Sequence, residues 1–221
     1  IGYQALLDVT TGSYNTGIGH RAGQNITTGV RNLAISPFSL QTLTNGSDNI
    51  AIGYAALESA TSASYNVAIG RSALAANTTQ SGNVAVGYEA LTTNTTASQL
   101  TAVGYEAGKT TSAGGGGSTF IGYQAGKVTT GGTNTFVGAT AGVANTTGQG
   151  NVALGYRALD ANTTASFTVA IGYNSLTNNT TGDRNMGVGT NTLGANTTGT
   201  RNIAIGRDTL LSNTTGGYNV A

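Results

Sequence analysis

A repeat of about 17 residues runs through the whole 221-residue sequence and constrains its fold more than any other feature. The most regular phrase of the repeat is Asn-Val-Ala-Ile-Gly, and its glycine position recurs thirteen times in register. A one-residue insertion in the glycine tract 114–117 is cancelled by a deletion before Asn134. Equal repeats of this length predict stacked structural units, because each unit is too small to bury a core alone. The glycine positions are Gly2, Gly19, Ser36 (replacing glycine), Gly53, Gly70, Gly87, Gly104, Gly122, Gly138, Gly155, Gly172, Gly189 and Gly206.

The residues before each glycine predict a short β-strand. An aliphatic residue stands immediately before the glycine, a small residue (usually Ala) before that, and Val, Ile, Leu, Met or Thr one place earlier. No window carries an apolar stripe at helical spacing, and β-branched runs bounded by Gly, Asn and Ser are typical of strands and turns. We therefore expect an all-β fold, a parallel β-roll or β-solenoid of about 13 coils with about 17 residues per coil, forming one repetitive segment over 1–221.

Side-chain alternation along the strand predicts two faces with different contents. The aliphatic residues one and three places before the glycine project to one face, and the alanine between them projects to the other. We assign the aliphatic face to the interior of the coil and the small alanine face to close approach of another sheet or chain. The predicted structural core column is Ile18, Ile35, Ile52, Ile69, Val86, Val103, Ile121, Val137, Leu154, Ile171, Val188 and Ile205.

The composition excludes several functional classes. Only 8% of residues are charged, against roughly a quarter in ordinary soluble domains. Nine Lys and Arg against eight Asp and Glu leave no basic patch for nucleic acid or for an anionic membrane surface. The sequence has no Cys and one His, so it offers no thiolate or multi-histidine metal site. No apolar run is long enough to span a membrane. We expect no cofactor, no metal and no enzymatic activity.

The phrase Asn-Val-Ala-Ile-Gly-Tyr-x-Ala-Leu-x-x-Asn-Thr-Thr-Gly resembles the head repeats of trimeric autotransporter adhesins, and more closely the longer repeats of phage tail-fibre and related surface-fibre proteins. The resemblance covers the whole chain and is specific at the Ala-Ile-Gly core. It implies a left-handed parallel β-roll that is trimeric about its long axis, with small residues facing the partner chains. The repeat of this chain is longer than is typical of that family. An alanine face that needs covering also favours a homotrimer.

Two side-chain columns are candidates for ligand contact. A tyrosine follows the glycine in many copies, and such rings could stack on sugars or pack on one another along a ladder. Glu89 and Glu106 occupy one column in adjacent coils, where carboxylates about 5 Å apart could perform glycosidase chemistry or bind a cation. We favour packing for the tyrosines and solvated surface for the glutamates. The candidate ligand-contact column is Tyr54, Tyr88, Tyr105, Tyr123, Tyr156 and Tyr173.

Several other motifs have simpler structural explanations. The tract 114–117 lacks the Lys-Ser/Thr of a phosphate loop and predicts a bulging turn. His20 and Arg21 interrupt the tyrosine column as surface substitutions. Glycosylation triplets recur too closely for a glycan on every coil, so their asparagines are expected to be turn residues that bond their own backbone. These asparagines are Asn77, Asn94, Asn145, Asn162, Asn179, Asn196 and Asn213.

The sequence therefore predicts a structural role in an extracellular fibre or adhesin, on a virion or bacterial cell surface. Repeated coils would supply a rigid rod, and exposed turns would contact a cell-surface receptor or glycan. The chain begins and ends within copies of the repeat, so we expect it to be an excerpt of a longer fibre protein. One alternative is an ice-binding β-solenoid with threonine ladders, although the adjacent Thr78 and Thr79 are expected to point in opposite directions. Another alternative is a polysaccharide-degrading β-solenoid enzyme, for which the sequence shows no carboxylate cluster in a cleft.

Overall fold

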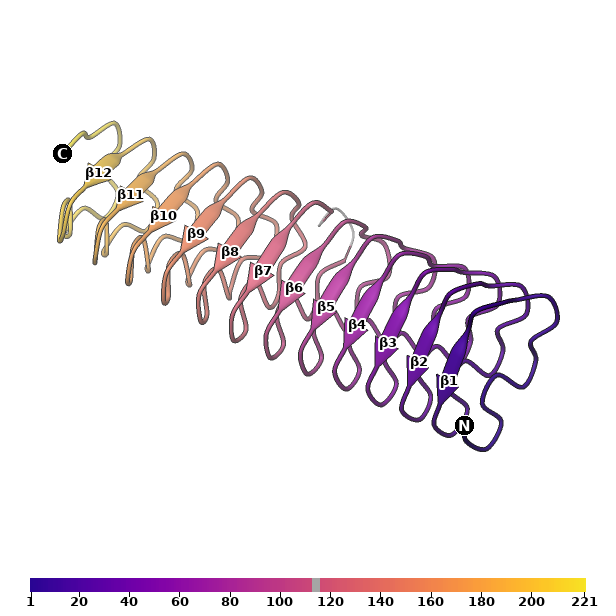
Figure 1. Cartoon of the computed structure of the whole chain (residues 1–221). Coiled ribbons are helices and arrows are strands. Elements are labelled where there is room, and N and C mark those ends of the chain that lie inside the picture. The colour runs from indigo at the N-terminus through magenta and orange to yellow at the C-terminus, as the bar shows by residue number, and fades with distance from the viewer. Residues whose placement is uncertain (113–115) are drawn as a thin grey trace. The chain divides into compact units, whose positions relative to one another are not determined.

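A computed structural model describes residues 1–112 and 116–221, and the chain divides into two compact units, 1–113 and 114–221. The predicted bulging turn at 114–117 lies partly outside the described residues. Each unit is a parallel β-solenoid, as the repeat predicted (Figure 1). The first unit contains β1 (Thr16–Ile18), β2 (Leu33–Ile35), β3 (Ile50–Ile52), β4 (Val67–Ile69), β5 (Val84–Val86) and β6 (Thr101–Val103). The second contains β7 (Thr119–Ile121), β8 (Thr135–Val137), β9 (Val152–Leu154), β10 (Val169–Ile171), β11 (Met186–Val188) and β12 (Ile203–Ile205).

Within each unit the strands pair in sequence order and in the register of the repeat. Ala51 lies opposite Ala34 and Ala68, the equivalent residues of the coils before and after it. Phe120 lies opposite Phe136 although the chain between them is shorter than in other coils, so the deletion before Asn134 keeps the columns aligned. Backbone hydrogen bonds between coils continue outside the strands, as in the 2.9 Å bond from Thr27 N to Thr44 O. Equivalent residues therefore stack in columns along each unit.

The repeat glycine lies where successive coils approach each other closely. Gly53 has φ +134°, and a Cβ atom added to it would lie 2.6 Å from the carbonyl carbon and oxygen of Gly70. Only a residue without a side chain fits there without strain. Ser36 takes this position with φ 96°. The following Pro37 is tolerated because the amide groups of the equivalent residues His20 and Tyr54 donate no backbone hydrogen bond in the described structure.

The interior of each coil is filled by small and polar side chains around one leucine column. The central residue of every strand is fully buried, usually as alanine, for example Ala68 and Ala170. Opposite it lies the residue four places after the glycine, usually a fully buried leucine such as Leu74 or Leu176. The interior is so narrow that a Cβ atom added to Gly17 of β1 would lie 2.8 Å from Leu6 Cγ.

The assignment of the aliphatic column to the interior was therefore wrong. Alternation along the strand was correct, but the faces are reversed: the alanine faces inward and its two neighbours face outward. The physical reason is the narrow interior, which the leucine column of the opposite wall already fills. In the predicted core column, Ile18, Ile69, Val103, Ile121, Leu154 and Ile205 are exposed, whereas Ile35, Ile52, Val86, Val137, Ile171 and Val188 are half-buried.

Two coils show the same packing with the sizes exchanged. Phe120 and Phe136 replace the strand alanine and are fully buried, with ring centroids 5.8 Å apart. In these coils the leucine position is Gly126 or Gly142, and a Cβ atom at either glycine would overlap the facing phenyl ring. A large strand residue with a glycine opposite therefore occupies the same space as alanine with leucine.

Buried asparagines form two hydrogen-bonded columns inside the coils. In the first, Asn49 donates from Nδ2 to Asn32 Oδ1 (2.9 Å) and to Ala63 O (2.8 Å). In the second, Asn196 donates to Asn179 Oδ1 (2.8 Å) and to the carbonyl of Gly199 (3.0 Å), three residues further along. The prediction that the asparagines of the glycosylation triplets bond their own backbone is confirmed for all seven. Six of the seven are fully buried, so their amides are not available to a glycosyltransferase.

Candidate functional site

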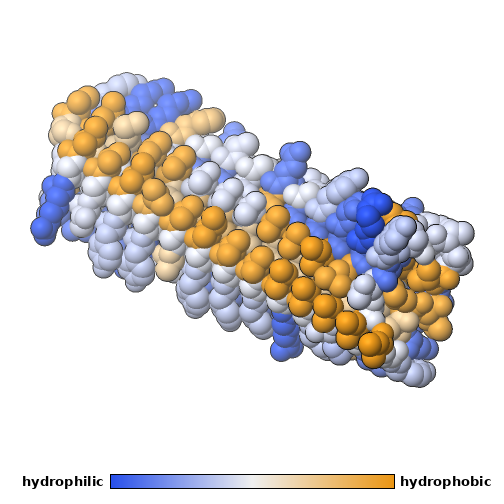
Figure 2. Space-filling model, in the orientation of Figure 1, coloured by the Kyte–Doolittle hydropathy of each residue, from blue (hydrophilic) through white to orange (hydrophobic). Residues whose placement is uncertain are grey.

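The outer side of the strands carries a continuous apolar face in each unit. It is formed by the residues one and three places before the repeat glycine, which lie on either side of the buried alanine. Figure 2 shows it as an orange band that follows the strands. We call these residues the apolar face: Ile18, Leu33, Ile35, Ile50, Ile52, Val67, Ile69, Val84, Val86 and Val103 in the first unit, and Ile121, Val137, Val152, Leu154, Val169, Ile171, Met186, Val188, Ile203 and Ile205 in the second.

The apolar face is uncharged and its side chains are substantially exposed. Ile18 is 41% exposed, Ile50 37% and Leu154 46%. The remaining members of its two columns are threonines, so no charged residue interrupts it in the strands. About ten aliphatic side chains per unit, each exposing on the order of 50 Å² of apolar surface, give roughly 500 Å² per unit. Monomeric proteins rarely expose contiguous apolar patches much larger than this. The apolar face is therefore the strongest candidate interaction surface of both units.

Within each unit, the tyrosines predicted as a ligand-contact column occupy the same position of their coils, immediately after the glycines. Tyr88 and Tyr105 stack with centroids 5.1 Å apart at 11°, and Tyr156 and Tyr173 stack at 5.3 Å and 20°. In these pairs each ring covers a face of its neighbour, so the rings present edges and hydroxyl groups to solvent. This arrangement favours packing along the ladder over stacking against sugar rings, and ligand contact by the column stays a prediction.

His20, which was expected to interrupt this column, in fact extends it, and Arg71 does the same at the equivalent position of another coil. His20 stacks on Tyr3 at 5.5 Å and contacts the edge of Phe38 at 5.2 Å. The guanidinium of Arg71 lies over the rings of both Tyr54 (5.7 Å) and Tyr88 (6.0 Å). A cation placed over an aromatic ring is attracted by the negative face of the ring, so arginine can replace tyrosine in the ladder.

Glu89 and Glu106 do not form a free carboxylate pair. Lys109 Nζ lies 2.6 Å from Glu89 Oε2 and 2.7 Å from Glu106 Oε1 and so bridges the two adjacent coils. Hydrogen bonds from Lys109 and from Tyr88 lower the pKa of Glu89, and the pKa of Lys109 is raised by its bonds to Glu106 and Glu89. A glycosidase acid needs a raised carboxyl pKa. The expectation of solvated surface was wrong for Glu106, which is 7% exposed.

The threonine ladder uses its hydroxyl groups within the protein. Thr27 Oγ1 donates to Thr44 O at 3.1 Å, and Thr197 Oγ1 donates to Thr214 O at 3.1 Å. Thr78 and Thr79 lie in a bend and not in a strand, so the strand alternation from which opposite directions were expected does not apply to them. Thr78 is half-buried and Thr79 is exposed, so both reach the surface. The columns that contain Thr78 and Thr79 follow a bend of the coil, whereas an ice-binding site requires a flat face.

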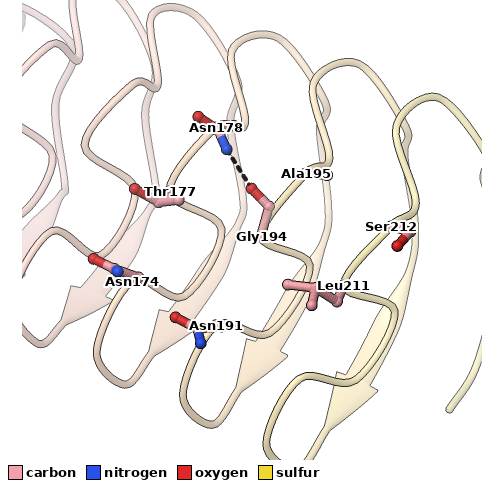
Figure 3. Close-up of a pocket in the computed structure, with 8 residues that line it drawn as sticks. All are labelled: Asn174, Thr177, Asn178, Asn191, Gly194, Ala195, Leu211 and Ser212. Carbon is pink, nitrogen blue, oxygen red and sulfur yellow. Dashed lines mark hydrogen bonds between the residues drawn. The ribbon is translucent and has the colours of Figure 1, made fainter.

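The second unit carries a surface notch of about 370 Å³, lined by residues of three successive coils (Figure 3). Asn174 and Asn191 lie along one edge, and Asn178 lies at the opposite edge. The side chain of Leu211 points toward Gly194, and its Cδ1 atom lies 3.0 Å from where a Cβ atom of residue 194 would be. No residue of this notch was a candidate in the sequence. Its only sequence signal is Gly194, the single glycine in a column that has side chains in all other copies.

Known proteins do not identify these surfaces: no family model, curated protein or solved structure matches the chain. The described residues contain no group of three or more His, Cys, Asp or Glu side chains placed to hold a metal ion. In the same part of the chain there is no helix with the length and hydrophobicity of a membrane span.

Proposed function

We propose that this chain is a structural segment of an extracellular fibre or adhesin, of a phage tail or a bacterial surface, in which three copies associate through their apolar faces. The observation that carries the proposal is the apolar face itself, which continues over the strands of both units without a charged residue. The structure reverses the face expected to meet a partner: it is the aliphatic face that needs covering, because the alanine face is already buried within the coil. Three is the number of copies that the sequence resemblance implies.

The size of the apolar face is consistent with association along the whole segment. Covering roughly 500 Å² of apolar surface in one unit would contribute about 12 kcal/mol at 25 cal/mol per Å². Association costs on the order of 4–15 kcal/mol in lost translational and rotational freedom and in side-chain ordering. One unit alone is therefore marginal, and stable association depends on the repetition of the face over many coils. A structural fibre uses this property, because its length and its cohesion increase together.

The coil interior supports a mechanical role. Backbone bonds join successive coils at the strands and at the turns, and the buried asparagine columns add side-chain bonds in the same direction. A coil held to its neighbours at so many points exposes few extended backbone segments to proteases or to local unfolding. This stiffness suits a segment that holds a binding tip away from its base.

Sedimentation equilibrium of the full 221-residue chain tests the proposal. We expect a trimer for the wild type and a monomer with retained β-structure for Ile52→Asn, Ile69→Asn and Val86→Asn combined. The matched control is Ser62→Asn, Thr79→Asn and Thr96→Asn, at exposed positions of the same three coils, in a column where Asn45 occurs naturally. The control should remain trimeric. A wild-type monomer that persists at high concentration, or a trimer unaffected by the apolar substitutions, would contradict the proposal.

Two assays on the same sample address the alternatives. Thermal hysteresis would indicate the ice-binding solenoid, and release of sugars from a polysaccharide would indicate the degrading enzyme. We expect neither, because the threonine hydroxyls bond the next coil and Lys109 forms ion pairs with both glutamates.

A further inference from the structure

The notch in the second unit arises from one missing side chain. The residues five places after the repeat glycine form a surface column in which Thr177, Gly194 and Leu211 follow one another. Thr177 and Leu211 carry side chains above and below, but Gly194 contributes only its backbone. The next position in that coil is Ala195, which is also small. The gap is therefore one coil high, and its volume of about 370 Å³ falls at the lower end of the range of ligand pockets, about 300–1,000 Å³.

The walls of the notch have unused hydrogen-bonding capacity. The side chain of Asn174 makes no hydrogen bond: its Oδ1 atom is buried without a partner, so the group that it can offer to a ligand is the Nδ2 donor. Asn191 donates from Nδ2 to Asp208 Oδ1 (3.0 Å), and Asn178 donates from Nδ2 to Gly194 O (2.6 Å). These two bonds fix both amides and leave their Oδ1 atoms as acceptors. The notch thus combines oriented acceptors, one unpaired amide and the apolar side chain of Leu211.

We propose that this notch binds one ring of a neutral saccharide. A pyranose carries neighbouring hydroxyl groups that both donate and accept, which matches acceptors at Asn178 and Asn191 together with the amide of Asn174. Its C–H surface can contact Leu211, as sugar and cofactor pockets combine apolar walls with a few placed polar groups. An anionic sugar fits less well. The carboxylate of Asp208 holds Asn191, that of Asp160 accepts from Thr177 Oγ1 at 2.8 Å, and no lysine or arginine lines the notch.

The site is independent of the apolar face, because its residues come from other columns of the coil. A chain that fails to form trimers could still bind the sugar, and a trimer could lack sugar binding. The two proposals therefore fail separately.

Saturation-transfer difference NMR on the full chain tests the proposal with methyl α-glucopyranoside, methyl β-galactopyranoside and methyl α-mannopyranoside, and with glucuronate as the charged comparison. We expect transfer to at least one neutral glycoside, with a dissociation constant in the millimolar range, and little transfer to glucuronate. Gly194→Thr restores the missing side chain and should abolish the signal. Asn174→Ala should weaken binding about tenfold, the size expected when one charge-neutral hydrogen-bonding group is lost.

Two features make the variants interpretable. Asn174 has φ 53°, and Ala55 occupies the same column position with φ 56°, so alanine is compatible with this backbone. Ala75→Thr adds the same side chain to the same column in the first unit and is the control, with binding expected to be unchanged. Absence of transfer to all three neutral glycosides would overturn the proposal. So would transfer that persists at wild-type strength in both Gly194→Thr and Asn174→Ala, or transfer to glucuronate as strong as to the neutral sugars.

Discussion

Aspartate substitutions at two adjacent positions of β4 test which face of the strand lies inside the coil. Ala68 is fully buried, whereas Ile69 is 36% exposed. An aspartate at position 68 enters a dry interior, where burial raises a carboxyl pKa by up to 3–5 units, which costs about 4 kcal/mol at pH 7, and its larger volume adds about 1–3 kcal/mol of overpacking. An aspartate at position 69 loses at most about 2 of the roughly 3 kcal/mol that full burial of isoleucine gives, because Ile69 is already partly exposed. The two substitutions should therefore differ by several kcal/mol.

Hydrogen exchange measured by mass spectrometry on the full chain is the suitable assay, because repeat arrays lose coils locally and a single melting temperature averages over them. We expect Ala68→Asp to remove protection from β3, β4 and β5, whose coils contact the substituted one. Ile69→Asp should retain this protection while weakening self-association. Loss of protection in Ile69→Asp that equals the loss in Ala68→Asp, measured at a concentration where both variants are monomeric, would refute the assignment of faces.

Two further predictions concern the interior packing and the ion-pair cluster. Phe120→Ala should lower the free energy of unfolding of its region by about 3–5 kcal/mol. Adding Gly126→Leu should restore most of this loss, because the coil of β9 has Ala153 and Leu159 at the equivalent positions. Gly126→Leu alone should lower the free energy of unfolding. If the double substitution changes the free energy of unfolding in urea by the sum of the two single changes, the two side chains do not share one space. The ion pairs of Lys109 with Glu89 and Glu106 should stabilise the first unit fully between pH 4.5 and pH 10.5, the ordinary pKa values of the carboxyl and ammonium groups. The reason is that folding lowers the pKa of Glu89 and raises that of Lys109. In Lys109→Met, stability should instead fall as the pH rises through 4.5, because the two neighbouring carboxylates become charged without the ammonium that lies between them. Urea midpoints of the variant that do not change with pH would contradict this role of Lys109.

Much of the fold was predictable because periodicity acts on the backbone. The repeat glycine marks the end of each strand, and the offset between successive glycines is also the register of Ala34 with Ala51. The deletion before Asn134 also keeps the columns aligned, as predicted. These features depend on chain length per coil and on backbone geometry, which the spacing of glycines reveals directly.

The contents of the two faces were not predictable from the strand alone. Alternation allows either face to be inside, and side-chain size favoured the aliphatic residues. The deciding fact is the width of the coil, which depends on the opposite wall. A signal for it does exist in the sequence: Phe120 and Phe136 coincide with Gly126 and Gly142. Such paired changes in size indicate that the strand centre faces the leucine column and therefore points inward.

The candidate surfaces also differ in how far the sequence predicts them. The tyrosine column could be predicted because it is periodic, but the notch at Gly194 is a single departure from periodicity, and its depth depends on Thr177 and Leu211 in neighbouring coils. The bridging position of Lys109 was also missed, because it lies three residues from Glu106 in one coil and near Glu89 in the next. Local departures of this kind need coordinates.

The coil distributes polarity in the opposite way to an ordinary antiparallel sheet, in which aliphatic side chains pack inside and amides face water. Here Asn32 and Asn49 are buried, and Ile18 and Ile50 are exposed. The interior tolerates these two asparagines because each amide is bonded to the asparagine of the coil before it and to a backbone carbonyl, so burial leaves neither amide unpaired. The exterior has no comparable compensation within one chain, because the leucine column and the strand alanines already fill the coil. An aliphatic column repeated on the outside of every coil gains free energy only when a second surface covers it. The internal bonds thus explain the stability of a coil, whereas the proposed function assigns the covering of the apolar face to partner chains, and a second and third copy of the same chain would offer a surface with the same spacing of coils.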